Sequence, residues 1–203
     1  GGGGVSMAAV RHVIVGASAA GIAAAEAIRS VDPKASITVI SEEPQEPYAR
    51  IFVPHRLREA VPVARLSMRP AGLWSRLGAT PLLGRAAVGL DVAGHTVRLS
   101  DGSSVPYDRL LIATGASPVA LPSECTGVDG VSGLRTWADA ERLAGWLANA
   151  RQVLVVGAGL VSLKALEQLV RLPVQLTVVA SSQQVLTQLL DPKPAQAVQA
   201  RLE

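Results

Sequence analysis

The chain has 203 residues, of which 49% are hydrophobic and 17% are charged. This composition supports a sizeable hydrophobic core and argues against intrinsic disorder. The formal net charge is only +3, and aromatic residues make up 3% of the chain. Because nucleic-acid binding usually needs clustered basic residues or aromatic stacking platforms, we expect no nucleic-acid partner.

Cysteine content and hydropathy narrow the class of protein further. The single cysteine, Cys125, excludes an internal disulfide and a CxxC pair. This content fits a reducing compartment, so we expect a cytoplasmic protein. No apolar run reaches the roughly 18 residues that a membrane span needs, so we expect no membrane association.

The first elements predict a βαβ unit. The apolar run His12–Val15 is typical of a buried strand and is followed by Gly16. The alanine-rich segment Ala19–Ser30 predicts a helix, which Asp32-Pro33 ends. Ser36–Ile40 predicts the next strand, so strand, glycine turn, helix and strand follow one another within about 30 residues.

Short elements are predicted between residues 41 and 112. Several prolines make 41–70 irregular, and a short helix is expected at Leu73–Leu77. Short strands are expected near Thr80–Leu83, Ala86–Asp91, Thr96–Leu99 and Ser104–Val105, as an antiparallel meander inserted into a parallel sheet. Leu110–Ile112 predicts a further buried strand.

The rest of the chain repeats the first pattern. The Pro- and Gly-containing stretch Ser117–Gly133 predicts a domain boundary, and Thr136 is a candidate N-cap of a helix over 136–150. A second strand, helix and strand are expected at Val153–Val156, Leu160–Val170 and Gln175–Val179. The fold class is therefore α/β and Rossmann-like: a parallel sheet with an inserted meander, then the start of a second Rossmann unit.

The first glycine loop indicates nucleotide binding. It consists of Gly16, Ala17, Ser18, Ala19, Ala20 and Gly21. In the dinucleotide fingerprint, small residues permit a tight turn, close backbone approach to a pyrophosphate, and close packing of helix on strand. Glu42 lies 21 residues after Gly21, with Glu43 beside it, where a carboxylate can accept hydrogen bonds from a ribose. The alternative is a structural turn followed by solvated glutamates.

The second glycine loop is Gly157-Ala158-Gly159-Leu160-Val161-Ser162. Its first two glycines match the fingerprint, and Ser162 replaces the third. Neither an acid nor a basic residue occurs in Ala180-Ser-Ser-Gln183, so the sequence does not distinguish NADH from NADPH. The alternative is a βαβ unit that binds no nucleotide.

Five strings carry a family resemblance: VIVGASAAGIAAAEAIR, ITVISEEPQEPYAR, YDRLLIATGASP, LRTWADAERL and VLVVGAGLVSLKALEQL. Together they resemble the FAD-dependent pyridine nucleotide-disulfide oxidoreductases, nearest to the branch of nitrite reductase flavoproteins and rubredoxin and ferredoxin reductases. The resemblance runs over almost the whole chain from Met7. It implies FAD at the first loop and NAD(P)H at the second.

The resemblance also implies individual roles. The first loop would hold the FAD pyrophosphate and Glu42 the ribose. Arg50 would lie near the flavin or its phosphates, unless it is an ordinary surface arginine. Ala113, Thr114 and Gly115 would pass beside the FAD, unless they only end a strand. Gly157, Gly159, Leu160 and Ser162 would meet the nicotinamide nucleotide. No catalytic acid or base and no metal ligand is expected, because the chemistry would be the cofactor's own.

Three features depart from the family pattern. Tyr48–His55 lacks the reactive cysteine of disulfide-reducing branches, so thiol–disulfide chemistry is not expected. Lys164 stands where many relatives have glutamate, and it would pair with a phosphate, pair with an acidic neighbour or stay solvated. Relatives are also longer, so we interpret the chain as a truncated protein or fragment.

We expect an incomplete FAD-binding domain at 7–120, a linker and helix at 121–148, and the N-terminal part of an NAD(P)-binding domain at 149–203. The expected function is an oxidoreductase that passes electrons from NAD(P)H through flavin to an acceptor protein or domain. One alternative is a truncated, non-catalytic module that binds FAD or an adenine nucleotide. Another is an assembly partner that borrows strands from a second chain. The acceptor and any homo-oligomer are left open.

Overall fold

The computed structural model describes residues 9–59, 61–119, 123–125, 127–182, 184–186 and 189–200. The chain forms two compact units, Gly1–Ala49 with Pro62–Ala116 and Arg50–Val61 with Ser117–Glu203. The units are therefore not contiguous in sequence, and the expected division at 120 and 148 stays a prediction. Met7 and Ala120, the expected ends of the first domain, lie outside the described residues.

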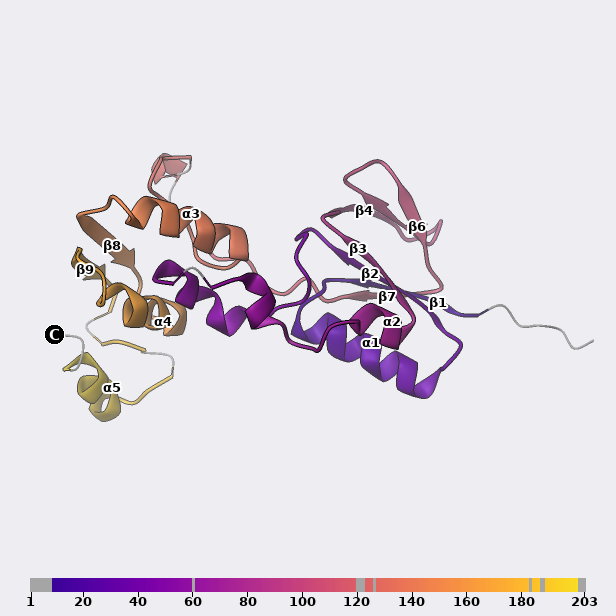
Figure 1. Ribbon diagram of the computed structural model, residues 1–203, viewed down its shortest axis with the longest axis horizontal. Helices are drawn as coiled ribbons and strands as arrows, with labels where there is room; N and C mark the ends of the chain where they lie inside the picture. The colour runs from indigo at the N-terminus through magenta and orange to yellow at the C-terminus, as the bar shows by residue number, and fades with distance from the viewer. Residues whose placement is uncertain are drawn as a thin grey trace, which may run out of the picture. The chain divides into compact units, whose positions relative to one another are not determined.

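A four-stranded parallel sheet forms the centre of the first unit, in the order β3-β2-β1-β7. Its strands are β1 (Arg11–Val15), β2 (Ser36–Ser41), β3 (Ala79–Leu83) and β7 (Arg109–Ile112). Helices α1 (Ala19–Val31) and α2 (Leu73–Leu77) cover one face (Figure 1). Strands β1, β2 and β7, and helices α1 and α2, are confirmed within one or two residues of their predicted bounds.

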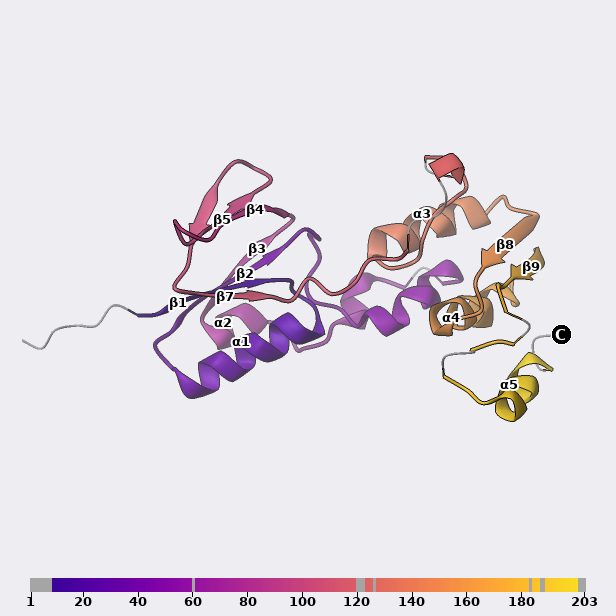
Figure 2. The same ribbon diagram turned by 180° about the vertical axis from the view of Figure 1, so that it is seen from behind.

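Strand β1 is apolar throughout its middle because both of its faces are buried. Ile14 packs with Ile22 of α1 and Ile37 of β2 on the helical side. Val13 points to the other face and packs with Val97 in a second, antiparallel sheet. This sheet has the order β4-β5-β6 and consists of β4 (Ala87–Asp91), β5 (Thr96–Leu99) and β6 (Ser104–Pro106). Figure 2 shows it on the side of the parallel sheet opposite α1 and α2.

One predicted strand belongs to a different sheet from the one expected. Thr80–Leu83 was expected within the meander, but β3 pairs in parallel with β2, with Thr38 opposite Thr80. Pro81 lies inside β3 and cannot donate a ladder hydrogen bond, which an edge strand tolerates. Strand periodicity gives no information about the partner of a strand. The error therefore arose between β3, an edge strand of the parallel sheet, and β4, the first strand of the antiparallel sheet.

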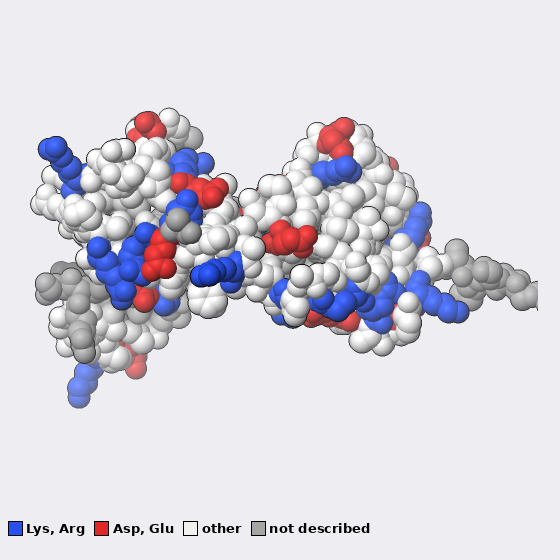
Figure 3. Space-filling view, in the orientation of Figure 1, with Lys and Arg blue, Asp and Glu red and all other residues white. Residues whose placement is uncertain are grey.

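Arg29 connects α1, the end of α2 and the segment before β2 through hydrogen bonds. From the last turn of α1, its guanidinium donates to the carbonyls of Leu77 and Gly78 at 2.6 and 3.2 Å, at the end of α2. It also donates to the carbonyls of Pro33 and Ala35 at 2.7 and 2.8 Å, just before β2. Figure 3 shows basic side chains over α1 and α2. The hydrogen bonds of Arg29 give this arginine a structural role.

The second unit has a smaller, two-stranded parallel sheet of β8 (Gln152–Val156) and β9 (Gln175–Val179). Its helices are α3 (Trp137–Leu147), α4 (Leu160–Leu169) and α5 (Pro192–Gln199), and 3₁₀ segments occur at η1 (Arg50–Leu57) and η3 (Ser123–Cys125). A further 3₁₀ segment, η2 (Val63–Leu66), belongs to the first unit. The irregular stretch expected over 41–70 thus contains two 3₁₀ segments.

The core of the second unit lies on one face of β8 and β9. Leu57 of η1 packs there with Ala165 and Leu169 of α4. On the opposite face, Leu154 and Val156 are each 61% exposed. None of the described helices combines the length and apolar character that crossing a bilayer requires.

Helix α3 begins with a capping box, and Thr136 is confirmed as its N-cap. The Asp139 N–H donates to Thr136 Oγ1 at 3.1 Å, and the Thr136 N–H donates to Asp139 Oδ2 at 2.9 Å. Burial alone would raise the pKa of Asp139, but the hydrogen bonds from Thr136 and Arg135 more than offset it and lower that pKa. Each of the two capping-box residues therefore accepts a hydrogen bond from the backbone N–H of the other.

Candidate functional site

The first glycine loop lies at the carboxyl edge of the parallel sheet. Val15, the last residue of β1, pairs with Ile40 of β2 on one side and with Ile112 of β7 on the other. The loop after β1 therefore lies at the point where the strand order reverses, with β2 on one side of β1 and β7 on the other. In open α/β sheets, ligands bind in the crevice at such a switch point.

Two glycines close this loop tightly. Gly16 has φ +120°, and a Cβ there would overlap the carbonyl oxygen of Ala113, the residue after β7. A Cβ at position 21 would overlap the carbonyl oxygen of Gly16. The Ala113 N–H in turn donates to the Val15 carbonyl at 2.7 Å. These are the tight turn and the close helix approach that the fingerprint requires of its first and third glycines.

The amino end of α1 is suited to an anion. Ser18 is its N-cap and makes no capping hydrogen bond through its side chain, and the first turn carries no acidic residue. Ala19 and Ala20 in the first turn are exposed, so none of the described side chains covers them. Helix N-terminal amides and the helix dipole favour negative charge at this position.

The predicted acids and residues 113–115 flank this loop. Glu42 follows the last residue of β2 and is exposed, whereas the Glu43 carboxylate accepts a hydrogen bond from the Tyr48 hydroxyl at 2.5 Å. Ala113 directly follows β7, and Thr114 and Gly115 come next. The structure thus brings the Gly16–Gly21 loop, Glu42 and Ala113 to one edge of the sheet.

The second glycine loop joins β8 to α4 and is more open. Gly157 has φ +102°, and a Cβ there would lie 3.7 Å from the Ser162 Oγ, at ordinary contact distance. Gly159 is the N-cap of α4, and a Cβ at this position would meet no atom of the described residues within 4 Å. Leu160 is 60% exposed beside it. Serine therefore fits at the third position here, and open space remains beside the helix end.

Backbone hydrogen bonds place the two loops in the same register. The Gly16 N–H donates to the Ile40 carbonyl at 2.8 Å, and the Gly157 N–H donates to the Val179 carbonyl at 2.6 Å. Val15 pairs with Ile40 just as Val156 pairs with Val179. The two βαβ units are therefore equivalent residue by residue at this edge.

This register identifies the residue that corresponds to the ribose acid. Glu42 lies two residues after Ile40, and Ser181 lies two residues after Val179. Ser181 is exposed, and the segment that follows it turns back to the loop, where the Leu186 N–H donates to the Ala158 carbonyl at 3.1 Å. The sequence showed no sign of this last contact, because Leu186 has φ +53° without being glycine.

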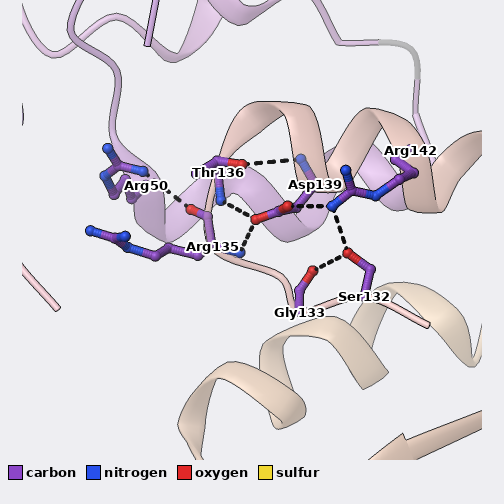
Figure 4. Close-up of polar contacts among 7 residues, drawn as sticks. All are labelled: Arg50, Ser132, Gly133, Arg135, Thr136, Asp139 and Arg142. Atoms are coloured by element: carbon purple, nitrogen blue, oxygen red, sulfur yellow. Dashed lines mark hydrogen bonds and ion pairs between the residues drawn. The ribbon is translucent and has the colours of Figure 1, made fainter. Parts of the chain in front are cut away.

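Arg50 lies in the second unit, beside an arginine that the sequence analysis did not select. Its Nη1 donates to the Arg135 carbonyl at 3.3 Å, and Arg135 Nη1 donates to Ser117 Oγ at 3.2 Å. Figure 4 shows the two arginine side chains extending to the same side, next to the first residues of α3. The string LRTWADAERL contains Arg135 and was the available signal. The expected place of Arg50 near a flavin stays a prediction.

Lys164, which departs from the family pattern, lies on α4. Lys164 Nζ lies 2.8 Å from Glu167 Oε2, so its partner is an acidic neighbour on α4. The hydrogen bond from Lys164 is the main cause that lowers the pKa of Glu167. Among the residues that the structure describes, no group of three or more His, Cys, Asp or Glu side chains could hold a metal ion.

Comparison with known proteins identifies relatives over nearly the full chain. The epsilon subunit of NADH-dependent phenylglyoxylate dehydrogenase from Aromatoleum evansii is 35% identical, covering 93% of this chain and 45% of its own length. Rubredoxin-NAD(+) reductase from Ectopseudomonas oleovorans is 32% identical, covering 94% and 50%. The chain thus spans about half the length of the curated relatives it matches.

A solved structure shows the same fold. The ferredoxin reductase for the CYP199A2 system from Rhodopseudomonas palustris superposes with a TM-score of 0.86 at 24% identity, covering 95% of this chain and 48% of its own. Residues 10–203 match the family described as pyridine nucleotide-disulphide oxidoreductase. Because that match spans nearly the whole chain, the chain belongs to this family.

Proposed function

We propose that the first unit binds FAD at the Gly16–Gly21 loop and that the second binds NAD(P)H at the loop beginning with Gly157. The whole protein would pass electrons from NAD(P)H through the flavin to an acceptor protein or domain. Residues 7–120 would belong to the FAD-binding domain and 149–203 to the NAD(P)-binding domain. Because the chain has a single cysteine, we propose that the protein is cytoplasmic.

The observation that carries this proposal is the closed corner at Gly16 and Gly21. Both positions exclude a side chain, and the amino end of α1 next to them has no acidic residue in its first turn. A diphosphate is the ligand chemistry that such a corner suits, since backbone amides hold it without a basic side chain. Glu42 at the same edge would accept hydrogen bonds from the ribose.

Residues around the loop would bind and orient the cofactor. Ser18 would add a hydroxyl donor to the pyrophosphate. Ala113 and the residues after it would pass along one side of the cofactor. Bound FAD would supply the hydride and electron chemistry, for which the protein contributes binding, orientation and electrostatics.

The second loop supports a nicotinamide nucleotide of either kind. Open space beside Gly159 and the exposed start of α4 would admit a pyrophosphate. Ser181 stands at the position of the ribose acid, so no carboxylate would repel a 2′-phosphate. Relatives named for rubredoxin and ferredoxin support a small electron-transfer protein as the acceptor.

A spectrum of the purified chain tests this proposal. We expect flavin absorbance bands to remain with the protein after incubation with FAD and desalting. Under anaerobic conditions, NADH or NADPH should then bleach these bands. Flavin that stays bound but is not bleached would favour the non-catalytic nucleotide-binding module, and loss of all flavin on desalting would contradict FAD binding.

A further inference from the structure

The turn after β2 carries three glutamates, and two of them are engaged by aromatic donors. Tyr48 donates its hydroxyl to Glu43 Oε2 at 2.5 Å, and Trp74 donates its indole N–H to Glu46 Oε2 at 2.8 Å. Within the described part of the chain, the Glu42 carboxylate has no hydrogen bond or ion pair. Adjacent acids of the same type thus have different surroundings.

Backbone contacts fix the chain on both sides of Glu42. The Ser41 carbonyl accepts from the Arg85 N–H at 2.8 Å, and the Glu43 carbonyl accepts from the Gly84 N–H at 3.1 Å. The Glu43 N–H also donates to Ser41 Oγ at 3.2 Å. Residue 42 is therefore held between two anchored neighbours, and its exposed side chain projects from a fixed backbone.

Tyr48 is itself a fixed donor. Its side chain is buried, with 5% exposure. The residues next to it pair with another strand-like segment, since the Ala49 N–H donates to the Leu66 carbonyl at 2.8 Å and the Pro47 carbonyl accepts from the Met68 N–H at 3.1 Å. A hydroxyl–carboxylate hydrogen bond is among the stronger ones in proteins, so the pair restrains the Glu43 side chain effectively.

We infer that Glu43 and Tyr48 form a positioning pair that leaves Glu42 as the single carboxylate of this turn available to the ribose of a nucleotide at the first glycine loop. The inference rests on the proposed nucleotide binding by the first unit. It also separates the two glutamates that the sequence placed together: Glu42 contacts the ligand, and Glu43 holds the turn in place.

The test uses the full chain and two probes, ADP and 2′-deoxy-ADP, with binding measured by calorimetry and FAD binding measured in parallel. The wild-type chain should prefer ADP because Glu42 accepts a hydrogen bond from the 2′-hydroxyl. Tyr48→Phe should reduce this preference about tenfold, the order of one hydrogen bond to a charged group. General destabilisation would weaken both probes equally and leave their ratio unchanged.

Tyr107→Phe is the matched control, because Tyr107 is the other tyrosine of the chain and is also buried in the first unit. It should keep the wild-type preference for ADP. Glu42→Ala removes the acceptor and should abolish the preference, and adding Tyr48→Phe to it should have no further effect on the ratio. Glu43→Gln keeps an acceptor for the Tyr48 hydroxyl and should retain most of the preference.

Several results would overturn the inference alone while nucleotide binding stands: an unchanged ratio in Tyr48→Phe, or a loss in Glu43→Gln as large as in Glu42→Ala. If Tyr48→Phe fails to fold, Glu43→Ala removes the same hydrogen bond without altering the buried ring and must lower the ratio. A wild-type chain that binds neither ADP nor FAD would contradict the proposed function itself, and the inference with it.

Discussion

The carbonyl oxygen of Gly16 occupies the place where a Cβ of residue 21 would lie. The first turn of α1 consequently packs directly against the corner that ends β1. The equivalent pair in the second unit, Gly157 and Ser162, stands far enough apart for a side chain. The two glycine loops of the chain therefore share one fingerprint, but the first is tightly packed and the second has room for a side chain.

Gly21→Ala should destabilise the first unit by about 3 kcal/mol, because overpacking against backbone cannot be relieved by a side-chain rotation. FAD retention should be lost together with the shape of the corner. Urea unfolding followed by circular dichroism measures the first effect, and absorbance after desalting measures the second. Gly159→Ala is the control: its Cβ meets no atom of the described residues, so the free energy of unfolding should fall by no more than about 1 kcal/mol. Equal losses in the two variants would refute this account of the two corners.

Ser181→Glu should create a preference for NADH over NADPH of at least about tenfold, or about 1.4 kcal/mol. A carboxylate at this position can accept a hydrogen bond from the 2′-hydroxyl of NADH and repels the 2′-phosphate of NADPH. Dissociation constants of the two nucleotides measure the effect. Ser104→Glu adds the same charge on β6 in the first unit and should leave the ratio unchanged. An unchanged ratio in Ser181→Glu would contradict the conclusion that Ser181 and Glu42 occupy equivalent positions in the two units.

Stability of the first unit should depend on the ionisation of Asp108. Hydrogen bonds from the Arg11 side chain, at 2.7 and 3.1 Å, and from its N–H hold the pKa of Asp108 well below its ordinary value. Because the folded pKa is lower than the unfolded one, near 3.9, this stabilisation is present above about pH 5 and is lost as the pH falls further. We therefore expect the free energy of unfolding, measured with urea between about pH 3 and pH 6, to depend less on pH in Asp108→Asn than in the wild type.

The matched control for this measurement is Asp129→Asn, a substitution of an exposed loop aspartate in the second unit. It should retain the pH dependence of the wild type for unfolding of the first unit. A wild-type slope in Asp108→Asn as well would show that the pair with Arg11 contributes nothing to stability at neutral pH.

Thr136→Ala should lower the free energy of unfolding of the second unit by about 1 kcal/mol, because it removes the hydroxyl that accepts from the Asp139 N–H. Thr136→Ser keeps that acceptor and should remain within a few tenths of the wild-type value, on the order of 0.3 kcal/mol. Thermal and urea unfolding measure both variants. If alanine and serine behaved alike, the capping box would have no energetic role at the start of α3.

Local pattern was enough to predict most elements of the fold. The β-branched runs that end at Gly16 and Gly157, and the helix that Thr136 caps, carry their signals within a few residues. Pairing between elements is not encoded so locally, which is why β3 was assigned to the wrong sheet. The grouping of Arg50–Val61 with the second unit likewise depends on contacts with α3 and α4, far along the sequence.

The same distinction holds at the candidate site. Glycine spacing and a downstream acid indicated the corner and the edge of the sheet where Glu42 lies. Spacing alone could not predict a separate role for Glu43, because the hydroxyl that engages it belongs to Tyr48, whose hydrogen bond depends on the folded turn. The contact between Arg50 and Arg135 was not predictable for a similar reason, because the two residues lie far apart in the chain.

Leu57 packs into a core whose other members, Ala165 and Leu169, are made much later in synthesis. On the ribosome, the parallel strands of the first unit are complete once β7 has emerged, whereas η1 must wait for α4 before its apolar side is covered. Non-local contacts of this kind slow folding because a long loop must close first. The order of translation therefore favours a nascent chain whose first nucleotide-binding corner forms while the second is still being made.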